Sequence, residues 1–149
     1  MIHLLDTDML IYIIRGLKSS RRPAQRQRAQ ELVHRCRELQ SAGDAVGLSA
    51  MSVSELEFGA RVSGQYDSEM AAVRKVLTPF EIYNYDSVAC PPHYGRIRHE
   101  LETKGVTIGS MDLLIAAHAL ALDATLVSNN VAHFSRVRGL RIANWIVRP

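Results

Sequence analysis

The chain has 149 residues, the size of one domain with a substantial core, and its 47% hydrophobic and 22% charged residues are ordinary for a globular protein. It holds only two cysteines, too few for a disulfide framework, and we expect both to be reduced thiols in a cytoplasmic protein. The longest apolar stretch, residues 113–122, is too short to cross a bilayer, so no membrane role is expected. We expect one domain over residues 1–149.

The net charge of +3 conceals an uneven distribution of charged residues. Residues 15–37 contain eight cations and one acid, whereas the rest of the chain is net negative. A separated basic segment suggests a polyanionic partner, although a solvated helix face explains the pattern about equally well. The cations are Arg15, Lys18, Arg21, Arg22, Arg26, Arg28, Arg35 and Arg37.

The first third of the chain predicts two strands and two helices. Residues 2–5 form a short apolar run typical of a buried strand, and a helix is expected to follow to about residue 17. Pro23 suits the first position of a second helix that ends near Gln40. Residues 45–49 predict the second strand. The second helix carries an apolar stripe with core spacing, made of Ala29, Leu32, Val33, Cys36 and Leu39.

The remainder of the chain continues this alternation. Ser52 and Glu55 have the spacing of a capping box, which predicts a helix from Ser52 to about Val62. Gly105 is expected to end a later helix. The further expected elements are a helix to 77 after a turn at 64–67, a strand over 80–83, a helix over 92–104, an apolar helix over 111–122, a strand over 125–127 and a weaker strand over 140–143.

Strands that alternate with helices predict an α/β fold in three layers. We expect a mostly parallel central sheet of four to five strands with helices on both faces. Functional sites in such folds form beyond the carboxyl ends of the strands. The positions to search are therefore those that follow Leu5, Leu48, Tyr83 and Val127.

Three acidic residues stand where this edge of the sheet is expected. Asp6 follows the first strand, Glu55 lies near the start of the helix after the second strand, and Asp112 leads the apolar helix. Three carboxylates placed together repel one another, and a divalent cation would offset that repulsion. Ligands that are all oxygen favour Mg²⁺ or Mn²⁺ over zinc. The fitting chemistry is phosphodiester hydrolysis by a metal-activated water.

Each acid also has a structural interpretation. Glu55 would complete the capping box. Asp6 could cap the first helix, although Asp8 is better placed to do so. The apolar helix could be capped by Asp112 or by Ser110.

Other polar residues are weaker candidates for a functional role. Glu57 is expected to be solvated, His118 to lie in the core or at an interface, and His133 to face solvent. The chain contains no GxxxxGK[ST], GxGxxG or GxSxG pattern, which argues against nucleotide-binding loops and serine hydrolases.

Four segments of the sequence resemble the motifs of PIN-domain ribonucleases, in the family's order and spacing over nearly the whole chain. The resemblance is greatest to the VapC-type toxins of bacterial type II toxin–antitoxin pairs. The segments are IHLLDTDMLI (2–11), SVSELEFG (52–59), IGSMDLLIAAHAL (108–120) and LVSNNVAHF (126–134), the last followed by Gly139-Leu140 and Asn144-Trp145.

This resemblance implies a PIN-like fold and a Mg²⁺-dependent endoribonuclease that acts on cellular RNA, often tRNA. It also implies a homodimer and a cognate VapB-type antitoxin. By position, Asp6, Glu55 and Asp112 match the family's metal-binding acids. Asn130 stands where many relatives have a fourth acid, which puts a second metal in doubt. Asp8 stands where the family commonly has Asn, and either adds charge near the metal or only caps the helix.

Two further expectations complete this view. Arg22, Arg26 and Arg28 of the basic segment are expected to contact RNA phosphates. Cys90-Pro-Pro92 falls where relatives continue a helix, and we expect a helix to begin there instead, because two prolines cannot lie inside one.

Two alternative functions fit parts of the pattern. One is a phosphatase that forms an aspartyl-phosphate on Asp6, since Asp6-Thr-Asp8 after a strand mimics such a nucleophile motif. Against it, the chain shows no suitable downstream block of lysine and paired aspartates. The other is a catalytically silent module that uses the PIN fold to bind RNA or a protein partner.

Overall fold

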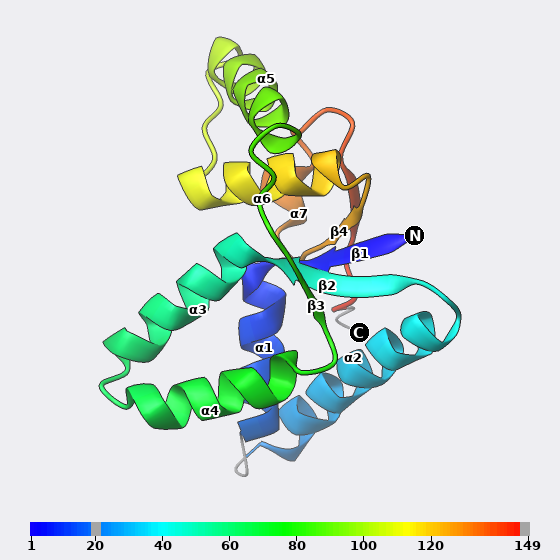
Figure 1. The fold of residues 1–149 in the computed structure, drawn as a ribbon, viewed down its shortest axis with the longest axis vertical. Helices are drawn as coiled ribbons and strands as arrows, with labels where there is room; N and C mark the ends of the chain where they lie inside the picture. The colour runs from blue at the N-terminus through cyan, green and yellow to red at the C-terminus, as the bar shows by residue number, and fades with distance from the viewer. Residues whose placement is uncertain (19–21, 147–149) are drawn as a thin grey trace.

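The computed structural model describes residues 1–18 and 22–146. Its centre is a parallel sheet in the order β3-β2-β1-β4-β5 (Figure 1). The central strand β1 pairs Leu5 with Leu48 on one side and with Val127 on the other. The strands are β1 Ile2–Leu5, β2 Ala45–Ser49, β3 Glu81–Tyr83, β4 Thr125–Val127 and β5 Arg141–Ala143. The expected parallel sheet is confirmed, including its weaker fifth strand.

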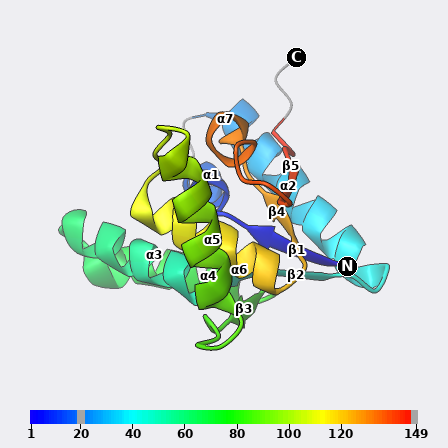
Figure 2. The same cartoon turned by 90° about the horizontal axis from the view of Figure 1, so that it is seen from above.

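Helices cover both faces of the sheet, which confirms the three layers (Figures 1 and 2). One face carries α1 Thr7–Lys18, α2 Pro23–Ser41, α3 Ala50–Val62 and α4 Tyr66–Leu77. The other face carries α5 Cys90–Thr103 and α6 Ser110–Ala121. A short helix that the sequence did not predict, α7 Val131–Phe134, follows β4. Among the residues described, no helix is both long and apolar enough to cross a membrane.

The pleat of the strands divides the core between these two faces. In β1, Leu5 packs in the cluster with α1 to α4, whereas its neighbour Leu4 packs with α5 and α6. In β4, Val127 and Leu126 divide in the same way. All four side chains are fully buried. Because successive side chains are buried on opposite faces, a strand covered on both faces has a continuous apolar sequence.

The prolines lie where expected, at the starts of two helices. Pro23 occupies the first turn of α2, and α5 begins at Cys90 with its two prolines in the first turn, where their missing N–H groups leave no helical bond unmade. Cys36 and Cys90 are buried free thiols. Arg21, one of the basic segment's cations, lies outside the described residues.

Two predicted helix caps are wrong. The amide of Met9 donates to Asp6 Oδ1 at 2.8 Å, so Asp6 caps α1, whereas Asp8 is already inside the helix and exposed. Helix α3 begins at Ala50 rather than at Ser52, because Ser49 accepts the Met51 amide at 3.0 Å and serves as its cap. Glu55 therefore belongs to the second turn of α3 and completes no capping box.

Helices α1 and α2 approach each other closely at Gly16. A Cβ atom added at Gly16 would lie 2.6 Å from Ala29 Cβ and 3.1 Å from the carbonyl oxygen of Gln25. Glycine is thus required where these two helices meet, and the crossing sets how α2 lies against the sheet.

We expect Gly16→Ala to lower the free energy of unfolding by about 1–3 kcal/mol, because one helix must shift to admit the methyl group. Gly59→Ala in α3 is the matched control, since a Cβ there meets nothing within 4 Å, and it should raise stability by about 0.5–1 kcal/mol. Urea unfolding of both variants measures the difference. Equal stability of the two variants would contradict the close crossing.

Candidate active site

Asp6 lies at the carboxyl end of the central strand, where β1 passes into α1. Its backbone amide continues the sheet by donating to the Val127 carbonyl at 3.0 Å. Its side chain is 4% exposed. Oδ1 accepts the Met9 amide, and Oδ2 accepts the hydroxyl of Ser128, a fully buried residue directly after β4. The carboxylate is therefore held from two sides while its remaining lone pairs stay free.

The environment of Asp6 opposes its ionised form. Burial raises the pKa of this carboxylate to about 6, against the lowering effect of the bonds from Ser128 and Met9. The negative charges of Asp8 and Asp112 raise the pKa further. These three acids are thus close enough to repel one another, which is the condition that favours a cation between them.

Asp112 approaches this group from the other face of the sheet. It lies in the first turn of α6, whose N-terminal cap is Gly109, and no side chain caps the helix. The expectation that Asp112 or Ser110 caps it is therefore wrong. Burial raises the pKa of Asp112, the Asp8 charge raises it further, and His133 lowers it.

His133 and Asn130 connect the two carboxylates through the loop after β4. His133 Nδ1 lies 3.9 Å from Asp112 Oδ2 and 2.9 Å from the side-chain nitrogen of Asn130. The backbone amide of Asn130 donates to Ser128 Oγ at 2.9 Å, and Ser128 in turn donates to Asp6. The expectation that His133 faces solvent is only half met, because its half-exposed side chain also lies against the site.

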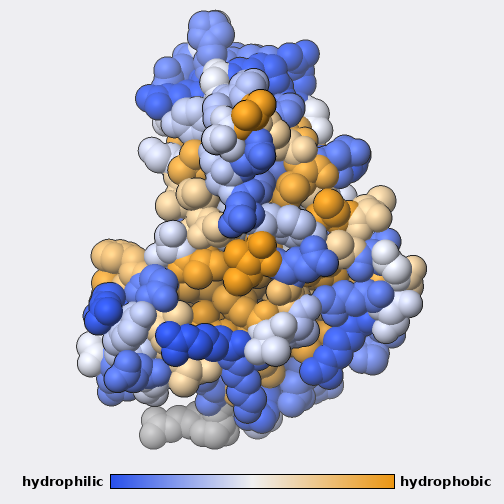
Figure 3. All heavy atoms as spheres, in the orientation of Figure 1, coloured by the Kyte–Doolittle hydropathy of each residue, from blue (hydrophilic) through white to orange (hydrophobic). Residues whose placement is uncertain are grey.

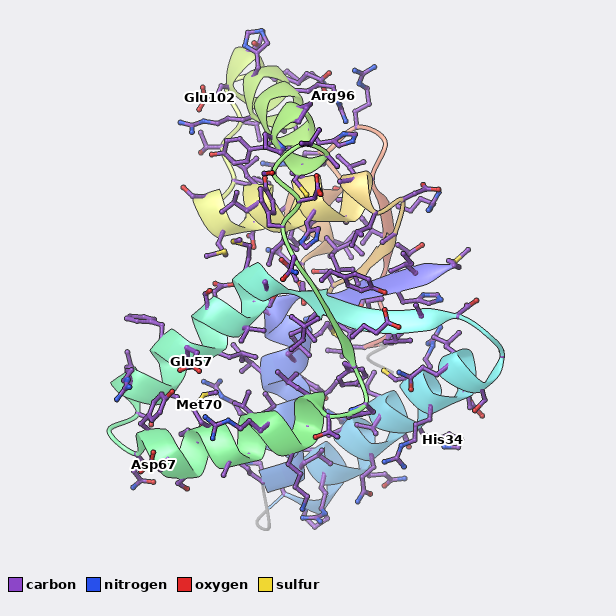
Figure 4. The ribbon with its side chains drawn as sticks, in the orientation of Figure 1. His34, Glu57, Asp67, Met70, Arg96 and Glu102 are labelled. Carbon is purple, nitrogen blue, oxygen red and sulfur yellow. The ribbon has the colours of Figure 1, made fainter. Side chains whose placement is uncertain are left out.

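Glu55 joins the site through Thr7, the residue after Asp6. The Thr7 hydroxyl donates to Glu55 Oε1 at 2.5 Å and lies 2.9 Å from the hydroxyl of buried Ser52. Glu57, two residues on, is not solvated as expected. It accepts the Tyr66 hydroxyl at 2.6 Å between α3 and α4, away from the strand ends (Figure 4).

The sequence analysis did not single out Thr7 or Ser128, and it named His133 only as a weak candidate. Ser128 carried a usable signal, because it directly follows β4 at the carboxyl edge of the sheet. His118 is the buried core residue that was expected, and its Nδ1 lies 2.7 Å from Ser49 Oγ.

The donors at this edge suit a hard divalent cation, since every acid and amide nearby offers oxygen. Burial is the main cause of the raised pKa of Asp6, and the charges of Asp8 and Asp112 add to it. Within residues 1–18 and 22–146, however, no three His, Cys, Asp or Glu side chains already surround one point closely enough to hold a metal. The charge of Asp112 acts on Asp6, while Glu55 accepts the hydroxyl of Thr7.

The predicted RNA-binding arginines lie at the far end of α1. Arg22 and Arg28 line a groove along α2, whereas Arg26 donates to the Leu17 carbonyl at 3.3 Å. Helix α1 has 12 residues and so extends about 18 Å. The start of α2 therefore lies about one helix length from the beginning of α1 (Figure 1).

Known proteins resemble this chain in both sequence and fold. The PIN domain profile matches residues 3–140. Ribonuclease VapC2 of Rickettsia felis is 34% identical over 145 residues, which cover 97% of this chain and 98% of the relative. The tRNA(fMet)-specific endonuclease VapC of Salmonella typhimurium is 36% identical over 98 residues, which cover 66% of this chain and 74% of that protein.

A solved structure agrees with these matches. The crystal structure of VapBC2 from Rickettsia felis bound to a DNA fragment from their promoter superposes with a TM-score of 0.80 at 31% identity, covering 98% of this chain and 100% of that one. The family match, the Rickettsia felis relative and the shared fold each span most of the chain. The chain belongs to the PIN-domain family and, within it, to the VapC-type ribonucleases.

Proposed function

We propose that this protein is a Mg²⁺-dependent endoribonuclease toxin that hydrolyses phosphodiester bonds of cellular RNA, with tRNA as its substrate class. The observation that carries the proposal is the Asp6 carboxylate, buried at the end of the central strand with its pKa raised by burial and by two neighbouring acids. The name of the Salmonella typhimurium relative, a tRNA(fMet)-specific endonuclease, supports the substrate class.

Asp6, Glu55 and Asp112 would hold the cation, Mg²⁺ or alternatively Mn²⁺. When bound, it supplies an activated water and neutralises charge on the phosphate. Ser128 and the Met9 amide orient Asp6, and Thr7 orients Glu55. Asn130 offers an amide rather than a charge, which favours one cation over two. Because Asp6 caps α1, Asp8 remains as an additional negative charge beside the site.

Two protein partners belong to the proposal: a second copy of the chain and a cognate VapB-type antitoxin. Large apolar side chains stay exposed on α3 and β3, with Phe58 at 71%, Val62 at 69% and Ile82 at 51%. Apolar surface gathers in the region between α3, α4 and β3 (Figure 3). Such a patch is typical of a surface that binds another protein. The antitoxin could inhibit by inserting an arginine among the carboxylates, where it would replace the metal's charge.

We expect Asp6→Asn and Asp112→Asn each to reduce metal-dependent RNA cleavage to background, because each removes one ligand charge and little volume. Asparagine caps helices as well as aspartate, so the far-UV circular dichroism of Asp6→Asn should match that of the wild type. Asp67 is exposed on α4 (Figure 4). The Asp67→Asn variant is therefore the control and should cleave RNA normally. Cleavage at the wild-type rate by either site variant would contradict the metal-site assignment and favour a silent binding module.

Glu55→Gln keeps the shape of the side chain and the hydrogen bond from Thr7 but removes the charge. We expect turnover to fall by about a hundredfold or more, the scale on which one electrostatic group acts in an active site. Glu57→Gln makes the same chemical change two residues away, where Glu57 only accepts from Tyr66, and should keep its turnover. Single-turnover cleavage of RNA compares the two, and normal turnover by Glu55→Gln would leave that residue a structural role only.

The raised pKa of Asp6 makes the stability of the metal-free protein depend on pH. In the folded state the acid binds a proton at pH values where the unfolded chain, with an aspartate pKa of about 3.9, has released it. Stability contributed by the protonated acid is therefore lost as the pH rises from about 4 to the folded value of about 6, and the loss is complete above that. At neutral pH the free energy of unfolding of the metal-free protein is thus lowered by the full cost of ionising the buried Asp6.

We expect millimolar Mg²⁺ or Mn²⁺ to raise the melting temperature at neutral pH, because the ions bind the native state. Asp112→Asn removes one charge that acts on Asp6, so in EDTA it should melt higher than the wild type and gain less from metal. Melting curves in EDTA and in metal, with Asp67→Asn as the control, measure both effects. A wild type indifferent to metal, or an Asp112→Asn variant less stable than the wild type in EDTA, would mean that these carboxylates do not converge.

A further inference from the structure

A groove runs along α2 between α1 and the segment that follows β5. Its inner part has a volume of about 210 Å³ and is lined by Tyr12, Arg28, Arg35 and Trp145, among others. Its outer part shares Tyr12 and Arg28 and continues to Arg22 at the start of α2. The groove is therefore one continuous feature that extends along the helix.

The charge of this groove is positive and unpaired. Arg28 and Arg35 lie seven residues apart, two turns along one face of α2. Within the part of the chain that the structure describes, neither these two nor Arg22 forms an ion pair. Among residues 1–18 and 22–146, Glu31 is the only acid that lines the groove. The guanidinium of Arg35 lies 4.7 Å from the centre of the buried Trp145 ring, which holds it against the wall.

The groove leads to the carboxylates along α1. Tyr12 lies one helical turn after Asp8 on the same face, a rise of about 6 Å. Asp8 is the residue whose charge acts on both Asp6 and Asp112. The opposite wall is anchored at the same edge of the sheet, because Asn144 donates to Asn129 at 3.3 Å. The groove thus begins one helical turn from Asp8, the acid that lies beside the site.

We propose that this groove holds an unpaired segment of the RNA away from the cleaved bond, with phosphates on Arg28 and Arg35 and a base stacked on Tyr12. Aromatic rings and arginines interleaved along a positive groove are what unpaired RNA requires. This inference rests on the proposed function, since it assigns that enzyme's substrate a path. An acidic protein segment would use the arginines but gain nothing specific from Tyr12, so the aromatic ring favours RNA.

The test measures binding of a fluorescent, unstructured oligouridylate in EDTA, where the RNA stays intact. The double variant Arg28→Gln, Arg35→Gln should flatten the slope of log affinity against log salt by about 1.4, since each phosphate contact on a single strand contributes about 0.7. Tyr12→Ala should weaken binding at least about fivefold, whereas Tyr12→Phe keeps the ring and should bind normally. Arg37→Gln removes one positive charge on the opposite side of α2 and is the control for a non-specific effect of lost charge, so it should leave both affinity and slope unchanged.

Circular dichroism and melting curves establish that each variant is folded. Wild-type salt dependence in the double variant, or Tyr12→Phe as weak as Tyr12→Ala, would overturn the proposal. Polyglutamate serves as a probe for an acidic protein segment. If the variants lose binding to polyglutamate but still bind the oligouridylate normally, the proposal is overturned and the groove is a protein-docking site. If the oligouridylate binds as expected but no RNA is cleaved in Mg²⁺, the groove stands and the nuclease proposal fails.

Discussion

The buried carboxylate of Asp6 is the constraint on which the rest of the site depends. One of its oxygens caps the N-terminus of α1 by accepting the Met9 amide. The other accepts the hydroxyl of Ser128, which lies directly after β4. A single side chain therefore joins the central strand, the first helix and the neighbouring strand. Burial makes the charged form costly, and the two hydrogen bonds only partly offset that cost. A cation at this point would turn an unfavourable arrangement into a binding site.

Helix α1 transmits the position of Asp6 to more distant parts of the molecule. Thr7 at its start reaches Glu55 on α3, and Asp8 adds negative charge toward Asp112. Tyr12 continues the same face into the α2 groove. At its far end Gly16 permits the close crossing that fixes α2 and its arginines. One helix thus relates the acidic end of the protein to its basic groove.

The two helical layers bring opposing acids to one edge of the sheet. Asp6 and Glu55 come from elements on the α1–α4 side, whereas Asp112 opens α6 on the other side. The loop after β4 spans the gap, since Ser128 contacts Asp6 and His133 lies near Asp112. Asp6 and Glu55 are each held by their own hydrogen bonds, and in the described residues they are not gathered with Asp112 around one point.

The sequence alone determined the strands and all helices except α7, since their signals are local. Apolar runs located β2 and β4, prolines located the starts of α2 and α5, and strand–helix alternation predicted the parallel sheet. Asp6, Glu55 and Asp112 could be selected because parallel strands align their carboxyl ends. The tertiary structure decided which groups meet. Whether Asp6 or Asp8 caps α1 depended on where β1 stops pairing, and Glu55 is separated by 48 residues from its partner Thr7. His133 and Ser128 gain their roles only when β4 lies beside β1. Sequence periodicity does not predict such pairings, because they arise from packing between segments that are distant in sequence.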